Sequence, residues 1–131
     1  MTIKLYQDTK WEKWRAKTFF TKEPETIAWI KTFKSGIFLD IGANIGIYSL
    51  YCAYMHPGMI IHAIEPYREN FIKLWRNIFL NNFYNIVAHY SVFDDHEIIW
   101  TKQKRMGDHL YTYAGFKQSI AFLDRDWETM L

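Results

Sequence analysis

Two glycines and two carboxylates around a predicted turn are the residues of this chain whose types and spacing could hold a ligand. The stretch FLDIGANIG at 38–46 joins a predicted strand to a predicted helix, with Gly42 in the turn and Gly46 at the start of the helix. Glycine permits the sharp turn and lets the helix approach a ligand without an intervening side chain. Glu65 ends the next predicted strand, from where an acidic side chain accepts hydrogen bonds from both ribose hydroxyls of a nucleoside. The pattern predicts a nucleoside site at the carboxyl edge of a parallel sheet.

The residues of the turn favour one nucleoside cofactor over another. A dinucleotide site uses the helix N-terminus for a pyrophosphate and usually has a third glycine, whereas Asn44 stands here where the second would be. Asp40 would repel a phosphate and attract an ammonium or sulfonium group. S-adenosylmethionine has both cations, a ribose and no phosphate, so we expect it rather than NAD. The alternatives are an ordinary turn beside a surface carboxylate, and an Asp40 that only caps the helix or pairs with a lysine.

Hydrophobic periodicity predicts the elements that position these residues. The expected helices cover 24–33, 45–55 and 67–82, and the expected strands cover 37–41, 59–64 and 85–90. This order, with right-handed crossovers, predicts an α/β fold with a Rossmann-like, partial parallel sheet. The tail is expected to be irregular or hairpin-like, with a possible strand at 96–101, a loop at 102–108 and a helical or irregular end at 120–131. Aromatic residues at helical spacing are expected in the core: Trp29, Tyr48, Tyr51, Phe71, Trp75 and Phe79.

Composition indicates one folded domain. The chain has 131 residues, a formal net charge of +2, 50% hydrophobic residues and 19% aromatic residues, which excludes overall disorder. We divide it into a lead-in at 1–22, a cofactor-binding core at 23–95 and a weakly patterned tail at 96–131. Charges of both signs are interspersed, so nucleic acid is not an expected partner.

Other chemistries lack their sequence signals. The single cysteine, Cys52, cannot form an internal disulfide, and the five histidines show no metal-binding spacing. No Gly-x-Ser-x-Gly surrounds Ser49, which argues against a hydrolase nucleophile. Without an apolar leader or a membrane-spanning run, we expect a soluble, cytoplasmic protein that has no membrane partner.

Several of these residues also match a known family. The segments Phe38–Leu50, Ala63–Pro66, Asn70–Phe71 and Leu74–Asn82 resemble the FkbM-type S-adenosylmethionine-dependent methyltransferases. Members carry Asp-x-Gly-Ala-Asn-x-Gly, followed by Glu-Pro and an Asn-rich helix end. The resemblance covers about residues 23–95.

The resemblance implies a class I methyltransferase fold, S-adenosylmethionine as cofactor, and methyl transfer to a hydroxyl of a small molecule or sugar. The implied cofactor-binding residues are Asp40, Gly42, Ala43, Asn44, Gly46, Glu65, Ser91 and Val92. Residues of the first turn would contact the methionine part, Glu65 would hold the ribose, and Ser91 and Val92 would flank the adenine. No metal is implied, and no general base stands out.

The chain departs from the family in length. Only 41 residues follow Tyr90, fewer than the missing half of a seven-stranded sheet needs. We therefore expect the cofactor-binding half of a methyltransferase, either cut short or completed by a second copy or a partner chain. The alternative is a non-catalytic cofactor-binding or scaffold module. Four late aromatic residues without an evident core are expected on an exposed surface: Trp100, Tyr111, Tyr113 and Phe116.

Overall fold

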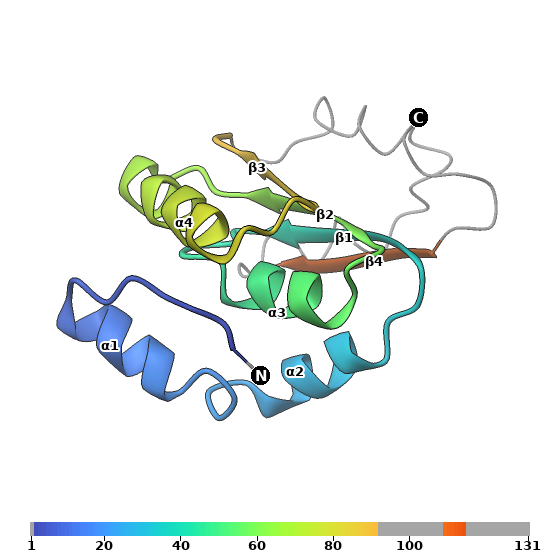
Figure 1. The fold of residues 1–131 in the computed structure, drawn as a ribbon, viewed down its shortest axis with the longest axis horizontal. Helices are drawn as coiled ribbons and strands as arrows, with labels where there is room; N and C mark the ends of the chain where they lie inside the picture. The colour runs from blue at the N-terminus through green and yellow to red at the C-terminus, as the bar shows by residue number, and fades with distance from the viewer. Residues whose placement is uncertain (1, 92–108, 115–131) are drawn as a thin grey trace.

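A four-stranded parallel sheet forms the centre of the molecule (Figure 1). The structure is a computed structural model and describes residues 2–91 and 109–114. Its strands are β1 (Gly36–Ile41), β2 (Ile60–Ile64), β3 (Ile86–His89) and β4 (His109–Ala114). They lie in the order β3-β2-β1-β4 and every neighbouring pair is parallel. The predicted α/β, Rossmann-like class is confirmed.

Four helices accompany the sheet, and α2, α3 and α4 lie along one side of it in Figure 1. Their bounds are α1 (Lys10–Lys17), α2 (Pro24–Lys31), α3 (Ile47–Met55) and α4 (Arg68–Asn81). The three predicted helices and three predicted strands are confirmed with small shifts at their ends. Helix α3 begins at Ile47 because Asn44 and Gly46 have positive φ angles of 58° and 100°, which a right-handed helix cannot include.

Strand β1 is buried on both faces, as its continuous apolar run predicted. Phe38 faces the helices with Ile61 of β2 and Ile86 of β3, and these side chains join one core with α2, α3 and Leu74 of α4. The opposite face of β1 carries Ile37, Leu39 and Ile41, which are also buried. Because β1 lies between two parallel neighbours, the turn that follows it is set at the middle of the sheet edge.

Strand β4 corrects the expectation of an irregular or hairpin-like tail at 109–114. It pairs in parallel with β1, which places Tyr111 beside Phe38 and Tyr113 beside Asp40. The Tyr111 ring stacks on Phe33 with ring centroids 3.9 Å apart. Tyr111 and Tyr113 therefore pack against the core, and their predicted place on an exposed surface was wrong. Trp100, Phe116 and the other elements predicted at 92–108 and 115–131 lie outside the described residues.

The N-terminal segment (residues 2–23) is an integral part of the structure rather than a loose lead-in. Thr9 caps α1 by accepting a hydrogen bond from the backbone N–H of Glu12 (3.1 Å). The buried Glu12 carboxylate pairs with Lys73 of α4 at 2.7 Å, and the Arg76 guanidinium lies 4.1 Å from the centroid of the Tyr6 ring. The Thr-x-x-Glu capping pattern was the sequence signal for this helix.

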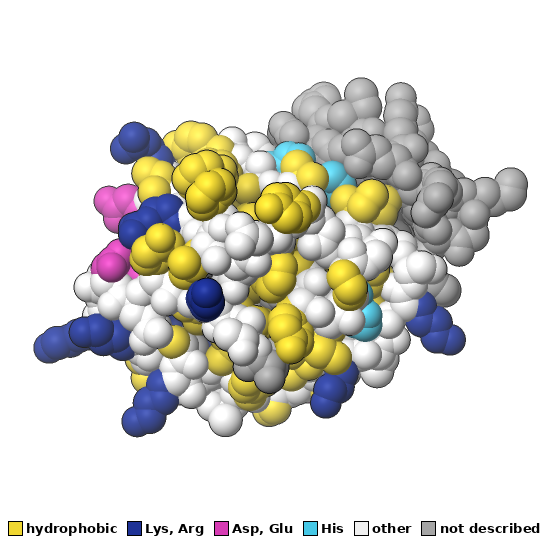
Figure 2. Space-filling model, in the orientation of Figure 1, with side chains coloured by type: hydrophobic (Ala, Val, Ile, Leu, Met, Phe, Trp, Pro, Cys, Tyr) yellow, Lys and Arg dark blue, Asp and Glu magenta, His cyan; other side chains and the backbone are white. Residues whose placement is uncertain are grey.

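Three of the aromatic residues expected in the core are exposed instead, and one of them, Trp29 of α2, is 36% exposed. Trp75 and Phe79 of α4 are 54% and 71% exposed, and their rings stack with centroids 5.6 Å apart. Tyr48 and Tyr51 of α3 are buried as predicted. Figure 2 shows hydrophobic side chains distributed over one face of the molecule. Within residues 2–91 and 109–114, no helix has the length and apolarity needed to cross a membrane.

Gly46→Ala tests the close packing of the turn. A Cβ at residue 46 would lie 2.7 Å from Leu74 Cδ1, and the φ of +100° strains any side chain there. We expect the free energy of unfolding to fall by roughly 2 kcal/mol or more in urea denaturation. Gly58→Ala is the matched control, because a Cβ there meets nothing within 4 Å. Equal stabilities of the two variants would contradict this account.

Candidate functional site

The turn after β1 is held by the end of β2. The backbone N–H groups of Gly42 and Ala43 both donate to the Ile64 carbonyl at 2.9 Å. The next N–H, that of Asn44, donates to Glu65 Oε1 at 2.8 Å. Gly42 reaches this geometry with a φ of 73°. Three consecutive amides of the turn are thus occupied by protein oxygens.

Glu65 lies beneath this turn and is only 3% exposed. Its second oxygen, Oε2, accepts a hydrogen bond from the backbone N–H of Tyr67 at 2.8 Å. A carboxylate has about four lone-pair sites, so these two bonds leave acceptor capacity for hydroxyl groups. Contact between Glu65 and a ribose remains a prediction.

Asp40 is completely buried, between the sheet and α3. Its Oδ2 accepts a hydrogen bond from Ser49 Oγ at 2.6 Å, and its Oδ1 has no hydrogen-bond partner among the residues that the structure describes. Burial raises the pKa of Asp40 to about 6; the Ser49 hydrogen bonds oppose this change, and the charges of Glu65 and Glu23 add to it. Ser49, rather than a helix end or a lysine, is the side chain that Asp40 contacts by hydrogen bond.

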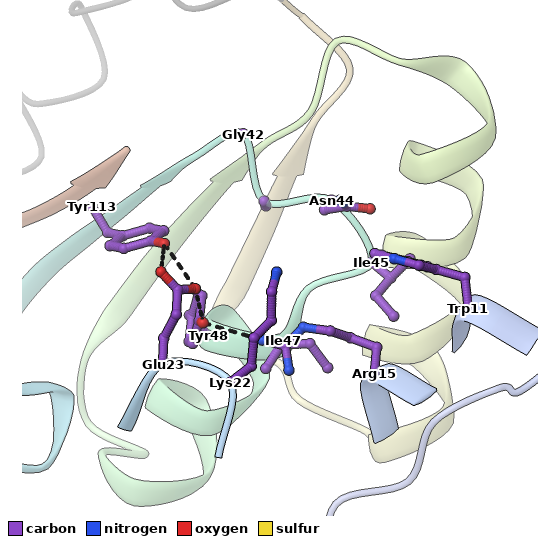
Figure 3. Close-up of a pocket in the computed structure, with 11 residues that line it drawn as sticks. Trp11, Arg15, Lys22, Glu23, Gly42, Asn44, Ile45, Ile47, Tyr48 and Tyr113 are labelled. Carbon is purple, nitrogen blue, oxygen red and sulfur yellow. Dashed lines mark hydrogen bonds between the residues drawn. The ribbon is translucent and has the colours of Figure 1, made fainter. Parts of the chain in front are cut away.

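A pocket of about 320 Å³ opens beside the turn (Figure 3). That volume is at the lower end of the ~300–1,000 Å³ typical of ligand sites. Three parts of the chain form its walls: the N-terminal segment, residues 42–48, and Tyr113 of β4. The charged side chains in the wall all come from the N-terminal segment, and they are Arg15, Lys22 and Glu23.

A chain of polar contacts crosses this wall. Arg15 donates to the Tyr48 hydroxyl at 3.1 Å, and Tyr48 donates to the Glu23 carboxylate. Tyr113 donates to the same carboxylate, with distances of 3.0 and 3.2 Å to its two oxygens. Burial and the neighbouring Glu23 raise the pKa of both tyrosines, so both phenols remain protonated donors at neutral pH.

The structure brings most of the predicted site residues to one edge of the sheet. Gly42, Ala43 and Asn44 line the pocket, whereas Asp40 does not. Among residues 2–91 and 109–114, the buried Oδ1 of Asn44 and Oγ of Ser91 have no hydrogen-bond partner. Gly46 is the N-cap of α3, and Glu65 lies under the turn. Val92 lies outside the described residues.

Sequence reasoning missed the charged wall. Arg15, Lys22 and Glu23 carry no motif, and no local pattern indicates that they reach the turn. The hydrophobic alternation of Tyr111 and Tyr113 was the one available signal for β4. Within the described part of the chain, no cluster of three or more His, Cys, Asp or Glu side chains could hold a metal ion.

The sheet order, the glycine turn after β1 and the acidic residue after β2 together define a Rossmann-like α/β fold. No protein-family profile matches the chain. It is 42% identical over 41 residues to the 31-O-demethyl-FK506 methyltransferase FkbM of Streptomyces tacrolimicus, which is 31% of this chain and 16% of that protein. The predicted resemblance is therefore confirmed over a short segment, and this chain spans a small part of the relative's length.

Solved methyltransferase structures are among those similar to this chain. The precorrin-6y C5,15-methyltransferase of Geobacter metallireducens superposes with a TM-score of 0.57 at 13% identity, covering 89% of this chain and 56% of that one. TYW2 of M. jannaschii, solved in complex with AdoMet, gives a TM-score of 0.49 at 20% identity, covering 59% and 35%. The first of these likenesses establishes a methyltransferase fold.

Asp40→Asn tests the buried carboxyl group. Its pKa in the folded chain, about 6, lies above the ~3.9 of an unfolded chain, so the wild type loses stability as pH rises from about 4 to 6. The variant has no such loss. Its free energy of unfolding relative to wild type should therefore rise by roughly 3 kcal/mol between pH 4 and 7, since a tenfold change in ionisation is worth about 1.4 kcal/mol.

Urea denaturation across this pH range measures the difference. Glu25→Gln removes an exposed carboxyl group on α2 and serves as the control, with an expected change of less than 0.5 kcal/mol, roughly the limit for surface substitutions. A pH-independent difference between Asp40→Asn and wild type would contradict the assigned burial of the charge.

Proposed function

We propose that this chain binds S-adenosylmethionine at the turn after β1 and acts in a methyltransferase that methylates a hydroxyl oxygen of a small molecule or sugar. The observation that carries the proposal is that the backbone amides of the turn are already hydrogen-bonded within the protein. The N–H groups of Gly42, Ala43 and Asn44 all donate to oxygens of residues 64 and 65. These three amides are therefore not free to bind a pyrophosphate that approaches the turn.

Electrostatics support the same cofactor. The charges of Glu65 and Glu23 both raise the pKa of Asp40, so three carboxyl groups lie near the turn. A negative environment of this kind favours a cation over a phosphate. Asn44 Oδ1 and Ser91 Oγ, which have no partner within the described part of the chain, follow β1 and β3, where a nucleoside could form hydrogen bonds with them.

Bound S-adenosylmethionine would supply an activated methyl group for in-line displacement by the acceptor oxygen. The contribution of this chain would be orientation, with Glu65 accepting from the ribose and the turn fixing the nucleoside beside the pocket. Proximity and alignment can contribute up to ~7–11 kcal/mol to such a reaction. A hydroxyl acceptor is proposed from the similarity to FkbM, a named O-demethyl-FK506 methyltransferase.

Calorimetric titration with S-adenosylmethionine and, separately, NADH tests the cofactor. We expect heat from S-adenosylmethionine alone, and Glu65→Gln should weaken its binding at least about tenfold, because an amide donates where the carboxylate accepts. Glu69→Gln, an exposed acid in the first turn of α4, is the matched control. No heat at millimolar S-adenosylmethionine, or binding of NADH instead, would overturn the cofactor assignment.

A further inference from the structure

We infer that the pocket between the N-terminal segment and the turn recognises the α-amino acid end of the cofactor, with Glu23 facing its ammonium group and Lys22 and Arg15 facing its carboxylate. This inference rests on the proposed function and assigns to it a set of residues outside the glycine motif. The carboxylate at the pocket wall is Glu23, whereas Asp40 is completely buried and does not line the pocket.

Glu23 has the geometry of an ammonium acceptor. It is half-buried, and Tyr48 and Tyr113 donate to it from opposite elements, α3 and β4, so its carboxylate is fixed in position (Figure 3). Two phenolic donors leave part of its acceptor capacity unused, since a carboxylate accepts about four hydrogen bonds. A charged donor such as an ammonium group forms the stronger, charge-assisted bond with such a carboxylate.

Two cations face the same space without carboxylate partners of their own. Arg15 is 3% exposed, and its hydrogen bonds go to the Thr18 carbonyl and the Tyr48 hydroxyl, both neutral groups. Lys22 is exposed, and its ammonium extends towards the turn in Figure 3. The ion pairs found among residues 2–91 and 109–114 are Lys73–Glu12 and Arg76–Asp8, so neither Arg15 nor Lys22 is in one.

A buried guanidinium is costly unless an anion compensates it. A ligand carboxylate in the pocket would provide that anion, while the ligand's ammonium would meet Glu23. An α-amino acid carries both charges on one carbon and is neutral overall, which matches a wall that has both signs. A phosphate would match the two cations but would face Glu23 as a like charge.

Two thioether ligands separate this inference from nucleoside binding. S-adenosylhomocysteine and 5′-methylthioadenosine share the adenosine and an uncharged sulfur, and only the first has the α-amino acid group. We expect Glu23→Gln and Lys22→Gln each to weaken S-adenosylhomocysteine about tenfold or more in calorimetry. Both variants should leave the affinity for 5′-methylthioadenosine within about twofold of wild type. Glu25→Gln and Lys31→Gln, exposed on α2 and outside the pocket wall, are the matched controls.

The outcomes are distinct. If the wild type binds both ligands and the pocket variants weaken S-adenosylhomocysteine and 5′-methylthioadenosine equally, or weaken neither, the amino-acid subsite is overturned. The nucleoside site is retained in that case. Wild-type protein that binds neither ligand overturns the proposed function as well. Lys22 is exposed, and its ammonium lies 6.0 Å from the centroid of the Trp14 ring, itself an exposed side chain. Lys22→Gln therefore keeps the test decisive if Glu23→Gln unfolds the protein.

Discussion

The structure depends on the way the end of β2 holds the turn after β1. Ile64 and Glu65 accept the hydrogen bonds of three successive amides, from Gly42 to Asn44. Buried amides must be paired, so the chain can leave β1 only along this path. The path requires left-handed residues, sets the start of α3, and makes the floor of the pocket. It also occupies three amides that a phosphate could otherwise contact, so the same hydrogen bonds that shape the turn also limit the ligands it can hold.

A second contact places the charged wall over that floor. Asn77 of α4, which is 1% exposed, accepts from the Tyr6 backbone N–H at 2.9 Å and donates to the Ile45 carbonyl at 2.9 Å. One buried amide thus joins the N-terminal segment, α4 and the turn. The Glu12–Lys73 ion pair strengthens the same attachment. Arg15, Lys22 and Glu23 therefore occupy fixed places although they precede the sheet in the chain.

Patterns within short stretches of sequence predicted the helices, the strands and the turn, which depend on residues close together in the chain. Periodicity located three helices and three strands, and the spacing from Gly42 to Glu65 placed both at one sheet edge. Three features escaped prediction because they depend on contacts distant in sequence: the pairing of β4 with β1, the attachment of residues 2–23 to α4, and the arrival of Glu23 at the turn. Trp75 and Phe79 fit the helical period, but the apolar face of α4 is wider than the part of the helix that packs against the sheet. These two side chains therefore remain exposed.

The position of Asp40 changes how the charge argument works. The sequence suggested a carboxylate in contact with the ligand, and the structure places it behind the pocket, where its pKa of about 6 leaves it mostly ionised at neutral pH. Its influence on a ligand is therefore through the electrostatic field, while Glu23 is the carboxylate available for contact. The coupling between the two is reciprocal: if a negative Glu23 raises the pKa of Asp40, a cation bound at Glu23 must lower it. A cationic ligand and an ionised Asp40 consequently stabilise each other, so the cost of burying Asp40 is least when the site is occupied.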